Sequence, residues 1–179
     1  DLLRLGGRLH GFQLWVNLPA KDKMKDPRYQ GYDADEITTV PLANGGSMKI
    51  VAGTVHGATG PVETTSPMTY AHASMKPGDV VEWAPPAGHT ALIHVFDGDA
   101  QVNDESVTSG QMAVFERSAG SVRVVAGGAG AQVLVLGGEP LGEPVARYGP
   151  FVMNTREELV TAVQEFNDGT LVKVGKATL

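Results

Sequence analysis

The sequence predicts an all-β fold, a small antiparallel β-barrel of the jelly-roll type, with one C-terminal α-helix. Between residues 78 and 125, short runs rich in Val, Ile, Phe and Trp alternate with Gly, Pro, Asp and Ser. The runs recur about every 8 to 12 residues, which is the spacing of antiparallel sandwiches and barrels. A single apolar stripe at helical spacing follows near the C-terminus. These observations together indicate a barrel followed by a helix.

Turn chemistry separates the expected strands. Three turns, at 77–79, 97–99 and 119–121, contain Pro-Gly-Asp, Asp-Gly-Asp and Ala-Gly-Ser, which supply a preset or a freely positive φ. The Asn-Gly-Gly sequence at 44–46 indicates a hairpin, because such a turn needs positive φ. The sequence therefore predicts strands at 37–43, 47–52, 68–75, 79–84, 90–96, 101–103, 111–115, 121–125 and 132–136.

A closing helix is expected after Thr155. Thr155 and Glu158 match a capping box, Asn154 is an alternative cap, and Gly169 is placed to end the helix. The apolar stripe consists of Leu159, Ala162, Val163 and Phe166. A stripe of this kind usually packs on the core, so we expect the helix to dock on the barrel.

Two segments at the N-terminus have a different character. Residues 9–18 alternate apolar and polar side chains, which predicts a strand that ends at Pro19. Residues 20–36 alternate Lys and Arg with Asp and contain few apolar residues, so they are interpreted as a linker.

Composition excludes several classes of function. The 179 residues suffice for one domain with a core, and a net charge of -6 with a pI near 5.3 argues against direct nucleic-acid binding. Because there is no cysteine, disulfides and thiol chemistry are excluded within this chain. No apolar run approaches the roughly 20 residues that span a bilayer. We expect a cytoplasmic protein with no membrane partner.

The order of turns in the central region resembles the two-motif core of a cupin. In that family the first motif carries two His two residues apart, a carboxylate and a closing Gly, and the second ends in a His. Residues two apart on a strand share a face, so both imidazoles can reach one metal. Counting back from Gly98, the two His positions fall between Ala84 and Ala87. The carboxylate position falls at or beside Ala91, and the second-motif His position holds Arg123.

The scaffold of these motifs is therefore present without their ligands. Alanine and proline offer no side-chain ligand, and a guanidinium repels a dication. The sequence predicts a cupin barrel that holds no metal.

His89 and His94 are the remaining candidates for a metal pair. They are five residues apart, so on one regular strand they would point to opposite faces. A loop after His89 would restore the geometry, but the sequence supplies no third and fourth ligand nearby. We interpret both as polar or rim histidines, and His10, His56 and His72 as isolated ones.

Three blocks in order along the chain resemble the pirin family. They are GFQLWVNLP at 11–19, KM at 23–24 with PRYQ at 27–30, and GEPL at 138–141 through EP at 143–144 to YGPFVMNT at 148–155. Pirins are bicupins, with two barrels in tandem, and the resemblance places this chain at their C-terminal part. It implies the final strand of a preceding N-terminal barrel at 1–19, a linker at 20–36, a C-terminal barrel without metal ligands at 37–146, and a closing segment with an amphipathic helix at 147–179.

The resemblance also implies an activity for the intact protein. In the family, iron or another divalent transition metal is held in the first barrel by three His and one Glu, and members are associated with quercetin 2,3-dioxygenase activity. None of these four ligands can be carried over to this sequence, so we expect no catalytic residue and no cofactor in this chain. The partners implied are the N-terminal cupin barrel and a flavonol-like small molecule.

A second class of function remains open, that of a binding module. Other family members regulate transcription factors or metabolic enzymes, which implies a protein partner. A cupin sugar isomerase would need a His-rich or lysine-lined interior, which the sequence does not contain. Candidates for a pocket wall in the preceding barrel are Gln13, Trp15 and Asn17, and the alternative for Trp15 is a core position. Candidates for the lining of a vestigial cavity in this barrel are His89, His94 and Arg123. Strand periodicity favours an outward orientation for Arg123, between Val122 and Val124.

Overall fold

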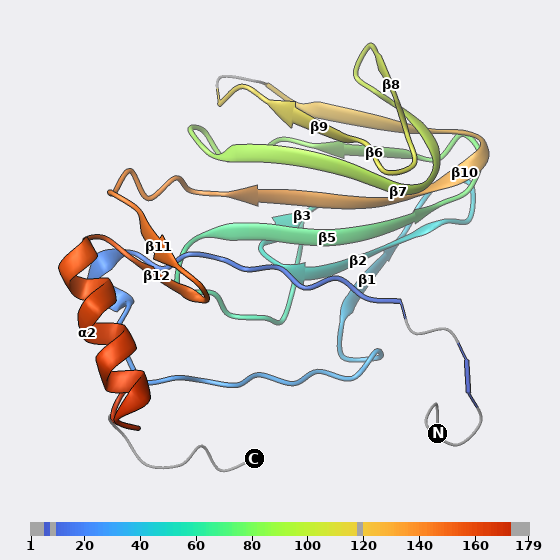
Figure 1. The fold of residues 1–179 in the computed structure, drawn as a ribbon. Coiled ribbons are helices and arrows are strands. Elements are labelled where there is room, and N and C mark those ends of the chain that lie inside the picture. The colour runs from blue at the N-terminus through green and yellow to red at the C-terminus, as the bar shows by residue number, and fades with distance from the viewer. Residues whose placement is uncertain (1–5, 8–9, 118–119, 173–179) are drawn as a thin grey trace.

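Two long antiparallel strands, β7 (Thr90–Val102) and β10 (Val122–Gly138), form the centre of the fold (Figure 1). The computed structural model describes residues 6–7, 10–117 and 120–172. The eight-stranded sheet has the order β1-β2-β5-β10-β7-β8, with β6 on β10 and β9 on β7. The other elements are η1 (Ala20–Asp22), β1 (Thr38–Pro41), β2 (Ser47–Ala52), β3 (Thr54–Val55), β4 (Ala58–Thr59), β5 (Met68–Met75), β6 (Val80–Trp83), β8 (Glu105–Thr108), β9 (Met112–Phe115), β11 (Ala146–Tyr148), β12 (Phe151–Met153) and α2 (Arg156–Asn167).

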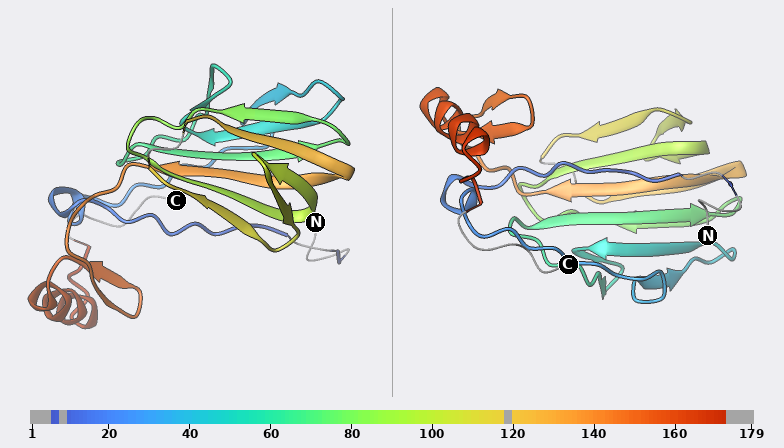
Figure 2. Two further views of the ribbon diagram at one scale, coloured as in Figure 1. Left: turned by 90° about the horizontal axis from the view of Figure 1, so that it is seen from above. Right: turned by 60° about the horizontal axis from the view of Figure 1, so that its bottom comes forward.

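Strand β10 takes part in both layers of the barrel (Figure 2). Its first part pairs with β6 and its second part with β5, both antiparallel. The register against β7 shifts between Ala126 and Ala131, where three of the four intervening residues are glycines. A bulge rich in glycine lets the strand bend from one layer into the other. The predicted antiparallel barrel with a C-terminal helix is confirmed.

Apolar side chains fill the interior of the barrel. Successive residues of a strand point to opposite faces, and on each central strand one face is almost inaccessible to solvent. The inward residues with less than 1% exposure include Met48, Ile50, Ala71, Ala73, Ile93, Val95, Val124, Val133 and Val135. Removing this surface from water is the main force that holds the two layers together.

The predicted turn at 97–99 is wrong. Strand β7 runs through these residues without reversing, and the predicted strands at 90–96 and 101–103 are one element. Gly98 has a φ of 73° and lies at an irregularity in the β7–β10 register, so its positive φ serves a bulge. Similarly, the predicted strands at 121–125 and 132–136 are parts of β10. The predicted turn at 119–121 lies partly outside the described residues.

Four short elements were not predicted from the sequence, namely the hairpins β3–β4 and β11–β12. Strand β8 was missed as well. The hairpin β3–β4 turns at His56 and Gly57, which both have positive φ. His56 is a rare non-glycine residue in this region of φ, which explains why the turn could not be read from composition.

The strand predicted at 9–18 is not formed in the described part of the segment. Residues 10–18 have no strand assignment, and residue 9 lies outside the described residues. A strand needs a neighbour for its backbone hydrogen bonds, and no described strand pairs with this segment. We call residues 10–18 the N-terminal segment. It runs along one face of the sheet (Figure 1).

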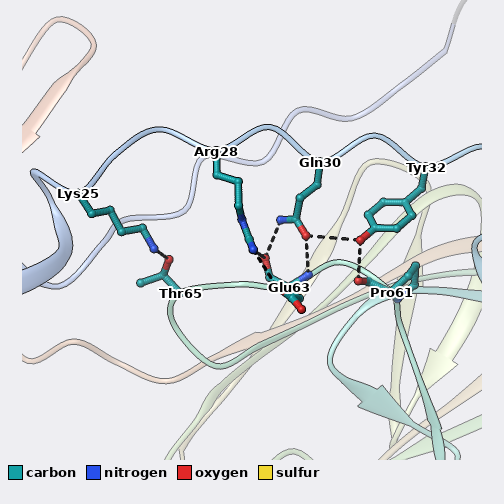
Figure 3. Close-up of polar contacts among 7 residues, drawn as sticks. All are labelled: Lys25, Arg28, Gln30, Tyr32, Pro61, Glu63 and Thr65. Carbon is teal, nitrogen blue, oxygen red and sulfur yellow. Dashed lines mark hydrogen bonds and ion pairs between the residues drawn. The ribbon is translucent and has the colours of Figure 1, made fainter. Parts of the chain in front are cut away.

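The segment interpreted as a linker is held against the barrel by side chains (Figure 3). Arg28 forms an ion pair with Glu63, with Nη1 and Oε2 2.7 Å apart. Gln30 exchanges two hydrogen bonds with the Glu63 backbone, at 2.8 and 3.1 Å. The Tyr32 hydroxyl donates to the Pro61 carbonyl at 3.0 Å, and Lys25 Nζ also donates to Thr65. Residues 25–32 are therefore an ordered strap along 61–65.

The closing helix begins after Thr155, as predicted, but it does not dock on the barrel as expected. Both hydrogen bonds of the Thr155–Glu158 capping box are present, and Gly169 ends the helix with a φ of 70°. However, α2 packs on the hairpin β11–β12, where Phe151 and Phe166 have ring centroids 5.7 Å apart, instead of on the main sheet. Figure 2 shows helix and hairpin projecting beside the barrel. Within the described residues, no helix is long and apolar enough to cross a membrane.

Candidate functional site

The described residues of the barrel interior offer no donor set for a metal ion. The positions expected for the two first-motif histidines lie between β6 and β7, and Ala91, at the expected carboxylate position, is 2% exposed within the apolar core. Among the residues that the structure describes, no three His, Cys, Asp or Glu side chains come close enough to hold a metal. The iron that the family resemblance implies for the intact protein therefore does not fit this barrel.

Arg123 lies on the outside of the barrel. Its neighbours Val122 and Val124 are buried, which turns the guanidinium outward, as strand periodicity favours. Arg123 Nε is 3.3 Å from Glu82 Oε1 on the adjacent strand, and both side chains are more than half exposed. An exposed ion pair of this kind contributes little to stability. Arg123 lines neither of the two cavities described below.

His89 and His94 are held separately. His89 precedes β7, its N–H donates to the Pro86 carbonyl at 3.0 Å, and its buried Nδ1 has no hydrogen-bond partner among the described residues. His94 lies within β7, with its Nδ1 3.0 Å from the Gln111 carbonyl oxygen. Among the described residues, neither histidine belongs to a group of three metal-ligating side chains.

A partly exposed face of the sheet lies opposite the core. The strand registers place His94, Leu134 and His72 side by side on β7, β10 and β5, with Met112 of β9 at one end. A neighbouring row contains Val114, Leu92, Leu136 and Tyr70. We call this surface the outer sheet face. Partial burial there raises the pKa of the Tyr70 phenol above its usual value, because the phenolate loses hydration.

The N-terminal segment contacts the outer sheet face through an aromatic cluster. Phe12 and Phe96 have ring centroids 4.7 Å apart in an edge-to-face arrangement. His10 and His72 lie 5.6 and 5.4 Å from the Phe96 ring, and His94 lies 6.4 Å from the Phe12 ring. Edge-to-face geometry at these distances is favourable. His10 and His72, interpreted from the sequence as isolated, therefore belong to one cluster.

Large apolar side chains remain exposed on this side of the molecule. Trp15 is 66% exposed and Val114 is 69% exposed. Phe12, Leu14, Val16 and Met112 are exposed by 37–49%. A group of exposed apolar residues on one face marks a surface for interaction, whereas single ones carry no such meaning.

Two cavities flank the N-terminal segment and share Trp15, Val16 and Asn17. The first, of about 530 Å³, lies between this segment and the ends of β5, β7 and β10, and Leu92 is among its walls. The second, of about 370 Å³, lies between the segment, Lys23 directly after η1, and the hairpin β11–β12. We call it the Arg147 pocket. Of the residues proposed for a pocket wall, Trp15 and Asn17 line both cavities, whereas Gln13, His89, His94 and Arg123 line neither.

These features define a cupin-type barrel whose interior is apolar and whose outer sheet face is partly uncovered. Residues 70–172 match the pirin C-terminal cupin domain. The chain belongs to the pirin family.

Several relatives of this chain are longer than it is. A Pseudomonas aeruginosa relative is 39% identical over 169 residues, which cover 94% of this chain and 59% of the relative. A pirin-like protein from Caulobacter vibrioides is 38% identical and covers 91% and 59% of the two chains. The solved structure of quercetin 2,3-dioxygenase from Acinetobacter baumannii is 34% identical with a TM-score of 0.82, covering 88% of this chain and 55% of that one. This chain thus spans about three fifths of the length of its curated relatives.

Proposed function

We propose that this chain is the C-terminal, metal-free half of a pirin-type bicupin, and that the intact protein is an iron-binding enzyme of the quercetin 2,3-dioxygenase type. By intact protein we mean the chain together with whatever residues its gene encodes before Asp1. In this proposal the metal lies in a preceding cupin barrel. The chain described here supplies a docking surface for that barrel, and it contributes no ligand to the metal.

The outer sheet face is the observation that carries this proposal. Its exposed apolar residues, together with those of the N-terminal segment, form a surface suited to a second folded body. The N-terminal segment already lies on this face through Phe12 and Phe96. A barrel that precedes this segment in the intact protein would therefore be joined to a segment that lies on the same surface. A preceding barrel packed here would bury Met112 and Val114.

The donor chemistry of this chain supports placing the metal elsewhere. A quercetinase-type reaction needs a metal with an open position for the flavonol or for dioxygen. The described residues contain no cluster of three metal-ligating side chains, and apolar residues fill the interior of this barrel. The quercetin 2,3-dioxygenase from Acinetobacter baumannii, which is similar over most of this chain, is also considerably longer.

A non-catalytic regulator of the pirin type is the second candidate function. The observation that favours it is the hairpin β11–β12 with α2, which projects beside the barrel and exposes Tyr148 by 67% and Val160 by 71%. A projecting apolar surface suits a transcription factor or a metabolic enzyme as a partner. Turnover distinguishes the two functions, because a regulator needs none.

Flavonol consumption tests the first proposal. The intact protein is loaded anaerobically with Fe²⁺ and then exposed to air. We expect it to consume quercetin and to take up a matching amount of dioxygen. The loss of quercetin absorbance measures the consumption. The 179-residue chain treated in the same way should show only the background rate, because its described residues supply no group of three metal-ligating side chains.

Metal-free intact protein is the control, and it should also remain at background. Turnover by the 179-residue chain would contradict the proposed division of labour between the barrels. Iron-loaded intact protein that consumes no quercetin would contradict the dioxygenase proposal and favour the regulator.

A further inference from the structure

The Arg147 pocket combines apolar walls with two cationic side chains. Trp15, Val16 and Pro150 contribute apolar surface, and Lys23 and Arg147 contribute the charges. Its volume of about 370 Å³ lies within the range of small-molecule sites in proteins. Binding sites of this kind combine predominantly apolar walls with a few polar groups that fix the orientation of the ligand.

Lys23 is positioned by the residues around it. Its Nζ donates to Asn17 Oδ1 at 2.6 Å and to the Val152 carbonyl at 3.0 Å. An ammonium group has three N–H donors, so these contacts leave one donor without a protein acceptor. Asn17 is fixed in turn, because its Oδ1 also accepts from the Leu18 N–H at 3.0 Å. The pocket thus contains an oriented ammonium group.

Neither cation has a counter-ion in the part of the chain that the structure describes. Lys23 and Arg147 form no ion pair there, and the Arg147 guanidinium makes no hydrogen bond. Glu143 approaches the same region, but its Oε2 accepts from the Ala20 N–H at 2.7 Å and from Asn154 Nδ2 at 3.0 Å. Glu143 also does not line the pocket. Within the described residues, neither cation of the pocket is therefore paired directly with a carboxylate.

We propose that the Arg147 pocket binds a small aromatic carboxylate. The planar guanidinium of Arg147 can donate two parallel hydrogen bonds to a carboxylate, and the remaining Lys23 donor adds a third. Trp15 presents a largely exposed indole against which an aromatic ring can pack. The inference concerns a site outside the barrel interior and does not depend on the proposed dioxygenase activity.

Calorimetric titration of the metal-free intact protein with 2-naphthoate tests this assignment. We expect saturable binding to one site, and at least about tenfold weaker binding of 2-naphthamide, which has a similar shape and no charge. Arg147→Gln should weaken naphthoate binding at least about tenfold, because it removes the bidentate partner. Because the Arg147 side chain is exposed and makes no hydrogen bond, this substitution leaves the fold intact.

Arg123→Gln is the matched control. It also removes one exposed arginine, but Arg123 lies on the outside of the barrel beside Glu82, so naphthoate affinity should stay within about twofold. Equal affinity for naphthoate and naphthamide, or equal losses in the two arginine variants, would overturn the assignment. Failure of the intact protein to bind naphthoate would overturn it as well.

Discussion

Asp79→Ala is expected to lower the free energy of unfolding by about 3–5 kcal/mol. The Asp79 side chain is fully buried, and its two oxygens accept three backbone hydrogen bonds. Asn44 N donates to Oδ1 at 2.6 Å, and Gly46 N and Lys76 N donate to Oδ2 at 3.0 and 2.8 Å. Alanine would leave these N–H groups without their acceptor, and each unsatisfied buried donor costs about 1–3 kcal/mol. One carboxylate thus joins the hairpin β1–β2 to the turn before β6.

Urea denaturation followed by circular dichroism measures this effect. Asp79→Asn should be intermediate, because its single carbonyl oxygen can replace only part of the acceptor capacity. Asp104→Ala is the control, because Asp104 is exposed in the turn between β7 and β8 and should change stability by less than about 0.5 kcal/mol. A loss below about 1 kcal/mol for Asp79→Ala would show that these hydrogen bonds do not hold the hairpin.

Gly98→Ala should destabilise the protein considerably more than Gly110→Ala. Both glycines have positive φ, 73° and 86°, so alanine costs roughly 1–2 kcal/mol at either position. A Cβ on Gly98 would also overlap the Gly130 carbonyl oxygen and lie 3.1 Å from Ala131 Cα, whereas a Cβ on Gly110 would meet no atom within 4 Å. The added crowding within the β7–β10 pair costs about 1–3 kcal/mol more.

Thermal unfolding of the two variants side by side isolates the effect of close packing from that of backbone conformation. We expect the melting temperature of Gly98→Ala to fall clearly below that of Gly110→Ala, which in turn falls slightly below that of the parent. Equal melting temperatures would mean that the bulge at Gly98 relaxes freely and that the close approach of β7 to β10 is not a constraint.

The two kinds of glycine turn explain where prediction of the fold succeeded and where it failed. The Asn-Gly-Gly sequence at 44–46 forms the predicted hairpin, with a φ of 91° at Gly45 and β1 paired with β2. The Asp-Gly-Asp sequence at 97–99 has the same local chemistry but forms a bulge within β7. Positive φ suits both structures, and only the pairing with β10, which is distant in sequence, decides between them.

Less of the candidate site than of the fold could be predicted from the sequence. Motif counting predicts that this barrel lacks metal ligands, because ligand positions on strands have fixed spacing, and this stays a prediction. The Arg147 pocket was missed except for Trp15 and Asn17, since its charges come from segments that meet only in three dimensions. Lys23, for example, bonds to the carbonyl of Val152, 129 residues away. The helix stripe was identified, but its partner, the hairpin β11–β12, was not.

The transition-metal content of the purified protein tests the central claim most directly. Elemental analysis should be made on the 179-residue chain and on the intact protein, both loaded with Fe²⁺ and then desalted. We predict about one tightly bound metal per intact protein and none in the 179-residue chain, because the described residues supply no donor cluster. About one metal in the shorter chain would contradict the account, and His89 and His94 would then be the first residues to replace.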